Sequence, residues 1–366
     1  MRRGWRNIMK KIFYVLNIDW NWIKQRPQFL AEGLSKLNNV LVAYRYKYNR
    51  KNLTIDKNIN KVHLSRIYTI PFINNKKMAK INERLFQFAI SSKINKFKPD
   101  YIYLTNPSQY EGLHLQQNVK IIYDCMDYHH AFIEDEKERK KLQSFEKKLV
   151  HDADLIIVSS EKLKENLILE YSLEVENDKI KIIRNGYDGK ILETAQYGQK
   201  GEKFIITYIG TISHWFDFDI ILKSLEDFVN IEFQIVGPIS KTQVVNDERI
   251  HYLGSVPHES LENIVKESSL LIMPFKVNEI VEAVDPVKLY EYINFNKNIL
   301  SVKYKEIERF EDFVYFYTNY EEFKENLERL LKNNTLKYSD EDRRRFLKEN
   351  SWEKRVEAIE ELLNNL

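Results

Sequence analysis

Cysteine is almost absent from this chain of 366 residues, and long apolar runs are missing altogether. The single cysteine, Cys125, excludes an internal disulfide and is typical of a reducing compartment. No segment approaches the ~18 consecutive apolar residues that a membrane-spanning helix needs. The run from Ile12 to Ile18 stops at Asp19, and no small-residue cleavage site follows it. We therefore expect neither a spanning helix nor a cleaved signal peptide.

The composition suits a chain with two folded domains and an uneven charge. Hydrophobic residues make up 43% of the 366 positions, which is enough for two cores of ordinary size. Residues 1–100 hold 22 Lys and Arg against 5 Asp and Glu, whereas the rest of the chain holds 35 against 49. A basic front part favours an anionic partner, for which nucleic acid, anionic lipid and a lipid-linked phosphate all qualify. A basic surface that only aids solubility is the alternative.

Short apolar segments alternate with helical patterns along the whole chain. The first half predicts strands at 11–18, 39–44, 99–105, 119–124, 153–160 and 179–184, and helices at 28–35, at 74–97, up to 152 and after a cap at Ser159 or Ser160. After a turn at 185–188 and a polar linker, strands are expected at 204–210, 230–237, 249–254, 270–274 and 298–302, and a last helix at 351–363. This alternation predicts an α/β fold with parallel doubly wound sheets. We expect two Rossmann-like domains facing across a cleft, 1–188 and 202–350, with the helix within 351–366 packing back on the first.

The segment 279–300 predicts a helix that begins beside a phosphate group. Asp285 is a favourable N-cap and Pro286 suits the first helical position. The free amides and positive dipole end there attract anions, and Lys288 adds a full charge. Glu291 lies one turn deeper on nearly the same face, where it could bind a ribose diol. An ordinary capped surface helix is the alternative interpretation of the same residues.

Four segments in order resemble the GT-B glycosyltransferases, in particular bacterial enzymes of the teichuronic-acid type. They are Asp19-Trp-Asn-Trp-Ile-Lys-Gln-Arg-Pro-Gln28, Tyr123-Asp-Cys-Met-Asp127 with Glu146 and Ala153-Asp154, Tyr208-Ile-Gly-Thr-Ile-Ser-His-Trp-Phe-Asp217, and Asn278-Glu279 with Asp285-Pro-Val-Lys-Leu-Tyr-Glu-Tyr292. The resemblance implies a hexosyltransferase whose second domain binds a UDP- or GDP-linked sugar and whose first domain binds the acceptor. It places Gly210, Thr211, Asp285, Pro286, Lys288, Tyr290 and Glu291 at the donor, with Lys288 on the phosphates and Glu291 on the ribose.

The chain departs from the family pattern at two places. Many retaining members carry a Glu eight positions before the ribose-binding Glu, but Ala283 stands there, with Glu282 and Glu279 nearby. The stereochemical course of the reaction is therefore open. At the helix end, Asn296-Lys-Asn298 replaces the usual Gly, and we expect Asn to adopt the left-handed conformation in its place.

Catalysis by an inverting member needs a general base from the first domain. Asp127, which follows the strand 119–124, is the first candidate and His130 the second. Asp127 could instead cap the next helix. Asp19, Trp20 and Arg26 follow the first strand and are expected at the acceptor, although Arg26 could simply pair with an acid. No cluster has metal-ligand spacing, so we expect no metal and no cofactor other than the donor.

The helix 74–97 carries many basic residues and suits contact with an anionic membrane surface. They are Lys76, Lys77, Lys80, Arg84, Lys93 and Lys96, followed by Lys98. Its apolar stripe of Met78, Ile81, Leu85, Phe88 and Ala89 is expected to pack on the domain core, which leaves loose peripheral contact with lipid.

The expected location is the cytoplasm, with the inner face of the cell membrane as an alternative. A catalytically silent sugar-nucleotide-binding or scaffolding homologue is the second functional hypothesis. Nucleic-acid binding is disfavoured because no aromatic-basic cluster is present.

Overall fold

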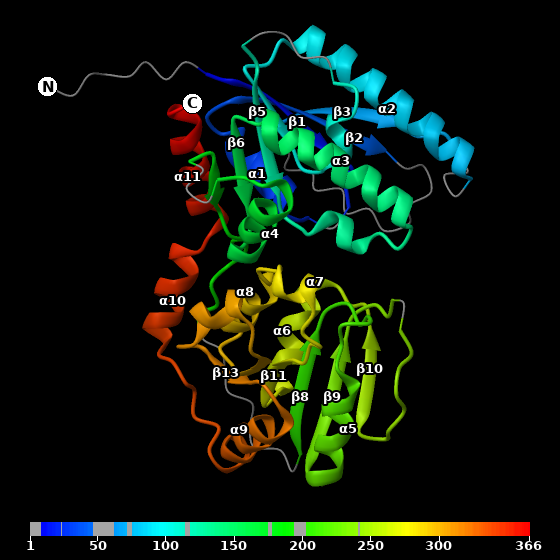
Figure 1. Cartoon of the computed structure of the whole chain (residues 1–366). Coiled ribbons are helices and arrows are strands. Elements are labelled where there is room, and N and C mark those ends of the chain that lie inside the picture. The colour runs from blue at the N-terminus through cyan, green and yellow to red at the C-terminus, as the bar shows by residue number, and fades with distance from the viewer. Residues whose placement is uncertain are drawn as a thin grey trace, which may run out of the picture. The chain divides into compact units, whose positions relative to one another are not determined.

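The computed structural model describes residues 9–22, 24–46, 62–71, 75–113, 118–174, 178–193, 203–240 and 242–366. The chain divides into two compact units (Figure 1). The first is Met1–Asn185 together with Trp352–Leu366, and the second is Gly186–Ser351. Within the described residues, no helix is both long enough and apolar enough to cross a bilayer.

A parallel seven-stranded sheet forms the centre of the first unit, with the strand order β3-β2-β1-β4-β5-β6-β7. The strands are β1 (Lys11–Leu16), β2 (Asn39–Tyr46), β3 (His63–Tyr68), β4 (Tyr101–Leu104), β5 (Lys120–Cys125), β6 (Leu155–Val158) and β7 (Ile180–Ile182). The order reverses between β1 and β4, as in doubly wound folds that bind ligands at the carboxyl ends of the strands. The predicted parallel α/β class is confirmed, and β3 was not predicted.

Helices cover both faces of this sheet. They are α1 (Arg26–Leu34), α2 (Lys76–Phe97), α3 (Glu136–Asp152), α4 (Glu161–Tyr171) and α11 (Trp352–Asn364), with short 3-10 helices η1 (Pro107–Tyr110) and η2 (His129–Phe132). Ser160 caps α4 by accepting a hydrogen bond from the Leu163 amide. Asp135 caps α3, and Tyr128 precedes η2 without a side-chain cap. The alternative that Asp127 caps the next helix is therefore wrong.

The late helix α11 packs against α1 in the core of the first unit (Figure 1). The rings of Phe29 and Trp352 stack with centroids 5.1 Å apart. A Cβ atom on Gly33 would lie 2.3 Å from Val356 Cγ2, so α1 and α11 approach this closely only because residue 33 is glycine.

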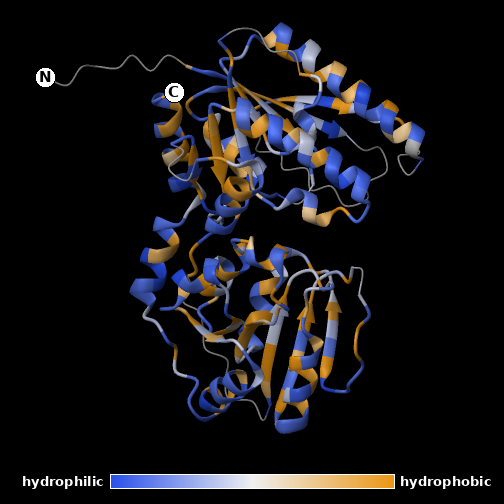
Figure 2. Ribbon diagram, in the orientation of Figure 1, coloured by the Kyte–Doolittle hydropathy of each residue, from blue (hydrophilic) through white to orange (hydrophobic). Residues whose placement is uncertain are grey.

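The second unit holds a parallel six-stranded sheet with the order β10-β9-β8-β11-β12-β13. Its strands are β8 (Phe204–Ile209), β9 (Ile231–Val236), β10 (Ile250–Gly254), β11 (Leu270–Met273), β12 (Ile299–Val302) and β13 (Val314–Tyr317). Its helices are α5 (Phe218–Asp227), α6 (His258–Glu267), α7 (Glu279–Glu282), α8 (Val287–Asn294), η3 (Lys305–Phe310), α9 (Tyr320–Lys332) and α10 (Asp340–Glu349). The order again reverses, between β8 and β11, which places the ends of these two strands at a switch point. The strands are largely apolar (Figure 2), as expected for a sheet covered on both faces.

The face of α2 that packs on the core is not the one that the sequence predicted. Phe86, Ile90 and Ile94 face the core, whereas Ile81, Leu85 and Phe88 are exposed. The prediction that the stripe containing Ile81, Leu85 and Phe88 packs on the core is therefore wrong. The helix carries two apolar faces, and the described residues of the first unit bury only the face with Phe86, Ile90 and Ile94.

Candidate functional site

A glycine lies at the carboxyl end of each of three neighbouring strands of the second unit. Gly210 and Gly237 directly follow β8 and β9, with φ angles of 149° and 141°, and Gly254 ends β10 at φ 66°. A Cβ atom on Gly237 would lie 2.0 Å from the carbonyl oxygen of Gly210. Since no side chain tolerates that distance, the close approach of the two strand ends requires glycine. These three glycines form what we call the glycine rim, and Gly210 follows β8, the strand at the switch point.

Lys288 lies directly against this rim. A Cβ atom on Gly210 would be 2.0 Å from Lys288 Cε and 2.7 Å from Nζ. The ammonium also lies 5.8 Å from the ring centroids of both Tyr208 and Phe275. Burial lowers the pKa of Lys288, although Glu291 acts in the opposite direction. Among the described residues, Lys288 makes no hydrogen bond or ion pair. The structure thus brings Gly210 and Lys288 together, as the family pattern implies.

The start of α8 differs from the prediction. Its N-cap is Pro286, and no side chain caps the first turn, so Asp285 as N-cap is wrong. The Asp285 carboxylate is only 1% exposed, forms an ion pair with Arg309 and accepts a hydrogen bond from the Tyr290 hydroxyl at 3.4 Å. Arg309 in turn donates to the Tyr290 hydroxyl at 2.7 Å. These buried groups lie beneath the helix start and fix its position, while the uncapped amides remain available for an anion.

Helix α8 is tied to the strand ends by Tyr292. Its hydroxyl accepts from the Ile209 amide at 2.8 Å and lies 3.3 Å from the Ile272 carbonyl oxygen. Thr211 contributes its carbonyl oxygen, which accepts from the Tyr208 hydroxyl at 2.9 Å. One tyrosine therefore holds the helix against β8 and β11, and another shapes the turn after β8.

Glu291 faces His258, a residue that the sequence reasoning missed. Glu291 Oε1 lies 3.5 Å from His258 Nε2, at the start of α6. This contact raises the pKa of His258 above its usual range. His258 lies 33 positions before Glu291 in the sequence, and no local pattern pointed to it. The other residues missed in this way are Gly237, Tyr292 and Arg309.

The two departures from the family pattern are also visible. Ala283 ends α7 and is buried, while Glu279 and Glu282 lie in the first turn of that short helix. Asn296 follows α8 with φ 56°, so the expected left-handed asparagine is confirmed.

Of the two candidate base residues of the first unit, His130 contacts Glu170. His130 is buried, and its Nε2 lies 2.8 Å from Glu170 Oε2. Tyr128 donates a hydrogen bond to the other oxygen of Glu170. Asp127 is partly exposed, and its carbonyl oxygen accepts from the His129 amide at 2.9 Å. His130 is thus held by a carboxylate other than Asp127.

The candidate acceptor residues are more buried than expected. Arg26 forms an ion pair with Asp124 at 2.9 Å and donates to Asn185 Oδ1 at 3.3 Å. Of the two alternatives for Arg26, the structure therefore shows the pairing with an acid. Asp19 is buried and accepts from the Asn21 amide at 3.0 Å, and Trp20 lies in the core of the unit.

Comparison with known proteins agrees with this architecture. No protein-family model matches the chain. TuaH of Bacillus subtilis (strain 168), named as a teichuronic acid biosynthesis glycosyltransferase, is 24% identical over 199 residues, which is 50% of each protein. The match therefore spans about half of that relative.

Solved structures match over nearly the whole chain. Sucrose-phosphate synthase from Thermosynechococcus elongatus has a TM-score of 0.73 at 13% identity, with 97% of this chain and 98% of that one covered. Anabaena HepE, in complex with UDP and glucose, has a TM-score of 0.66 at 12% identity, with 98% and 100% covered. TarM gives the same values. The chain has the GT-B fold.

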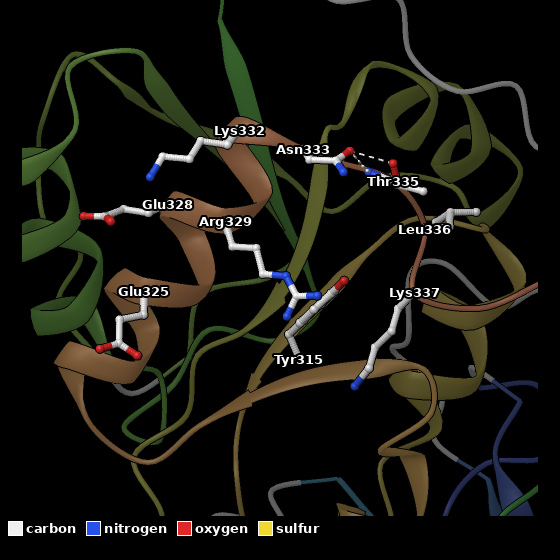
Figure 3. A pocket seen from close by; sticks show the side chains of 9 residues that line it. All are labelled: Tyr315, Glu325, Glu328, Arg329, Lys332, Asn333, Thr335, Leu336 and Lys337. Atoms are coloured by element: carbon white, nitrogen blue, oxygen red, sulfur yellow. Dashed lines mark hydrogen bonds between the residues drawn. The ribbon is translucent and has the colours of Figure 1, made fainter.

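A pocket of the second unit lies away from the glycine rim. It has a volume of about 650 Å³ and is formed by α9, the following loop and Tyr315 of β13 (Figure 3). Arg329 and Lys337 lie over the Tyr315 ring, at 5.5 and 5.0 Å from its centroid. The Lys337 ammonium donates a hydrogen bond to the Val314 carbonyl oxygen at 2.8 Å. The Lys337 backbone amide donates to Asn298 Oδ1 at 3.1 Å, and Asn298 directly precedes the amino end of β12. This pocket is therefore at the opposite end of the sheet from Lys288.

No group of three or more His, Cys, Asp or Glu within the described part of the GT-B chain could hold a metal ion. The absence of a catalytic metal stays a prediction. In its place, the groups available to neutralise a diphosphate are the ammonium of Lys288 and the first amides of α8.

Replacing Gly237 by alanine should damage the rim. The new Cβ atom would meet the Gly210 carbonyl at 2.0 Å, and the backbone that holds Lys288 would have to move. Gly254→Ala is the matched control, because it also needs a positive φ but has open space around it. We expect Gly237→Ala to be about 1–3 kcal/mol less stable than Gly254→Ala in urea unfolding, which is the usual cost of overpacking. Equal stabilities would contradict the close approach.

Proposed function

We propose that this protein is a glycosyltransferase that moves a sugar, a hexose by family resemblance, from a nucleoside diphosphate sugar to a saccharide or lipid-linked acceptor. The process would be the synthesis of bacterial cell-surface polysaccharide. The observation that carries the proposal is the ammonium of Lys288, which lies against Gly210 beside the uncapped start of α8. A buried cation beside free amides is stabilised by an anion, and a diphosphate offers several charge-assisted hydrogen bonds at once.

Each group has a role in the proposed donor complex. Lys288 and the first amides of α8 bind the diphosphate and stabilise it as it departs. Gly210 and Thr211 let the backbone approach the donor. Glu291 accepts hydrogen bonds from the ribose diol, and for this it exchanges its contact with His258 for one with the sugar. Asp285 and Tyr290 act indirectly, by holding the helix start with Arg309.

Two kinds of similarity support the donor class. HepE, which shares the fold, was crystallised with UDP and glucose. A second structure with the fold, named trehalose-6-phosphate from E. coli, contains bound UDP-2-fluoro glucose. It matches this chain with a TM-score of 0.66. The resemblance to TuaH supports the polysaccharide pathway.

The base is proposed to be His130 or Asp127. Glu170 fixes the ring of His130, which is how a carboxylate orients a general base. Asp127 is the more exposed of the two, which favours access of an acceptor hydroxyl. Asp19, Trp20 and Arg26 would shape the acceptor side through the backbone that they hold, because their side chains are buried.

The test is a titration followed by a turnover assay. Isothermal titration with UDP, GDP and their sugars should show binding of one nucleotide in the presence of EDTA. Release of that nucleoside diphosphate in the presence of saccharide or lipid-linked acceptors would then demonstrate transfer. No binding by any nucleotide would contradict the donor site. Binding without hydrolysis or transfer from any donor would favour the catalytically silent homologue, a hypothesis that the buried Ala283 motivates.

A further inference from the structure

The outward face of α2 carries an apolar stripe that the described part of the first unit leaves uncovered. Ile81, Leu85 and Phe88 are spaced by four and three residues, so they line up along one side of the helix. Their exposed fractions are 44%, 43% and 76%. Single exposed apolar residues are ordinary, but three in register on a helix of 22 residues form a continuous strip.

The core does not need this stripe. Phe86, Ile90 and Ile94 supply the buried face, and at about 100° per residue they lie on roughly the opposite side of the helix. Asn82 is also turned inward, where its side chain bonds both the amide and the carbonyl of Ile70, at 2.7 and 3.0 Å. Selection for stability of the unit alone therefore gives no reason for a second apolar face.

Basic side chains border the stripe. Lys77 and Arg84 lie on one side and Lys96 on the other, and Lys80 lies further round. All four are exposed. The only acid of the helix, Glu83, is paired with Arg45 at 2.7 Å and does not offset these charges.

Along α2 the hydropathy alternates between polar and apolar over short distances (Figure 2). An apolar strip bordered by cations has the form of helices that lie in the interface of a lipid bilayer.

We propose that α2 is a lipid-docking helix whose apolar stripe enters a bilayer rich in anionic lipids. Ile81, Leu85 and Phe88 would lie at the boundary between headgroups and acyl chains, and the bordering cations would contact lipid phosphates. Charge complementarity selects this partner, since a nucleic acid would leave the apolar strip in water and an apolar protein face would leave the cations unpaired. The proposal goes beyond the transfer reaction and stands independently of the donor site. It would bring the first unit to a lipid-linked acceptor.

The test is flotation of the full-length protein with vesicles of phosphatidylcholine alone or with about one third phosphatidylglycerol. Binding to the anionic vesicles is expected. The triple variant Ile81→Ser, Leu85→Ser, Phe88→Ser should bind at least about tenfold more weakly, because three apolar contacts exceed the ~1.4 kcal/mol that a factor of ten represents. The variant Lys77→Gln, Lys80→Gln, Arg84→Gln should lose the preference for anionic vesicles. Leu169→Ser with Val229→Ser is the matched control, since both residues are exposed and lie outside α2.

A fluorescent label separates insertion from surface contact. Cys125 is the only cysteine and is buried, so a dye can be attached selectively at Ser92→Cys, on the exposed side of α2, or at Leu169→Cys as the control. A polarity-sensitive dye at 92 should shift to the blue with anionic vesicles, and a dye at 169 should not. Unchanged vesicle binding by the triple serine variant would overturn the proposal. A dye at 92 that stays in water, or binding of RNA in place of vesicles, would also overturn it.

Discussion

Lys288→Ala is expected to weaken the binding of the donor nucleotide by at least about thirtyfold. The ammonium lies against Gly210 and near the rings of Tyr208 and Phe275, in the first turn of α8. Removing one partner of a buried charge pair typically costs about 2–5 kcal/mol, and ~2 kcal/mol already corresponds to about thirtyfold. Isothermal titration of wild type and variant with the nucleotide that binds best gives the ratio directly.

Two controls separate the charge from the packing. Lys288→Met keeps the aliphatic stem against the Tyr208 and Phe275 rings and should lose as much affinity as alanine with less loss of stability. Lys266→Ala removes an exposed lysine of the same unit, paired with Glu262, and should bind like wild type. Wild-type affinity in Lys288→Met would show that the phosphates are bound elsewhere.

Arg26→Met is expected to cost the first unit about 3–5 kcal/mol of its free energy of unfolding. Arg26 and Asp124 are both buried and share several hydrogen bonds, at 2.9 to 3.1 Å. The variant leaves the Asp124 carboxylate buried without its cation, and breaking one side of such a pair has this typical cost. Urea unfolding at neutral pH measures the loss.

A second variant tests whether the unpaired charge causes this loss. The double variant Arg26→Met, Asp124→Leu removes both charges and should recover much of the stability. If Arg26→Met is as stable as wild type, or if the double variant recovers nothing, the ion pair does not stabilise the packing of α1 against β5.

The apolar strands were predictable because each is a short buried run with polar borders. The strands β3 and β13 were missed for physical reasons. β3 lies at an edge and buries only Ile67 among its six residues, so its hydrophobic signal is weak. β13 has four residues and follows an acidic segment without a strong turn signal.

Within the site, residues that belong to a short sequence motif were predictable, and partners far apart in the sequence were not. Lys288 and Gly210 came from motifs, whereas the partner of Asp285 is Arg309, 24 residues later. Asp285, a favourable N-cap residue, therefore forms a buried ion pair, and Pro286 stands at the N-cap position. Helix α2 shows the same limit, because both of its faces are apolar and only tertiary contacts decide which of them is covered.

The packing of α11 inverts the order in which the two units can be completed during synthesis. The second unit is one continuous stretch, Gly186–Ser351, and all of it leaves the ribosome before α11 does. The core of the first unit includes Trp352, Val356, Ile359 and Leu363 of α11, which packs against α1. The unit that begins first is thus finished last, and until then the apolar core residues that α11 covers stay exposed to the cell's chaperones.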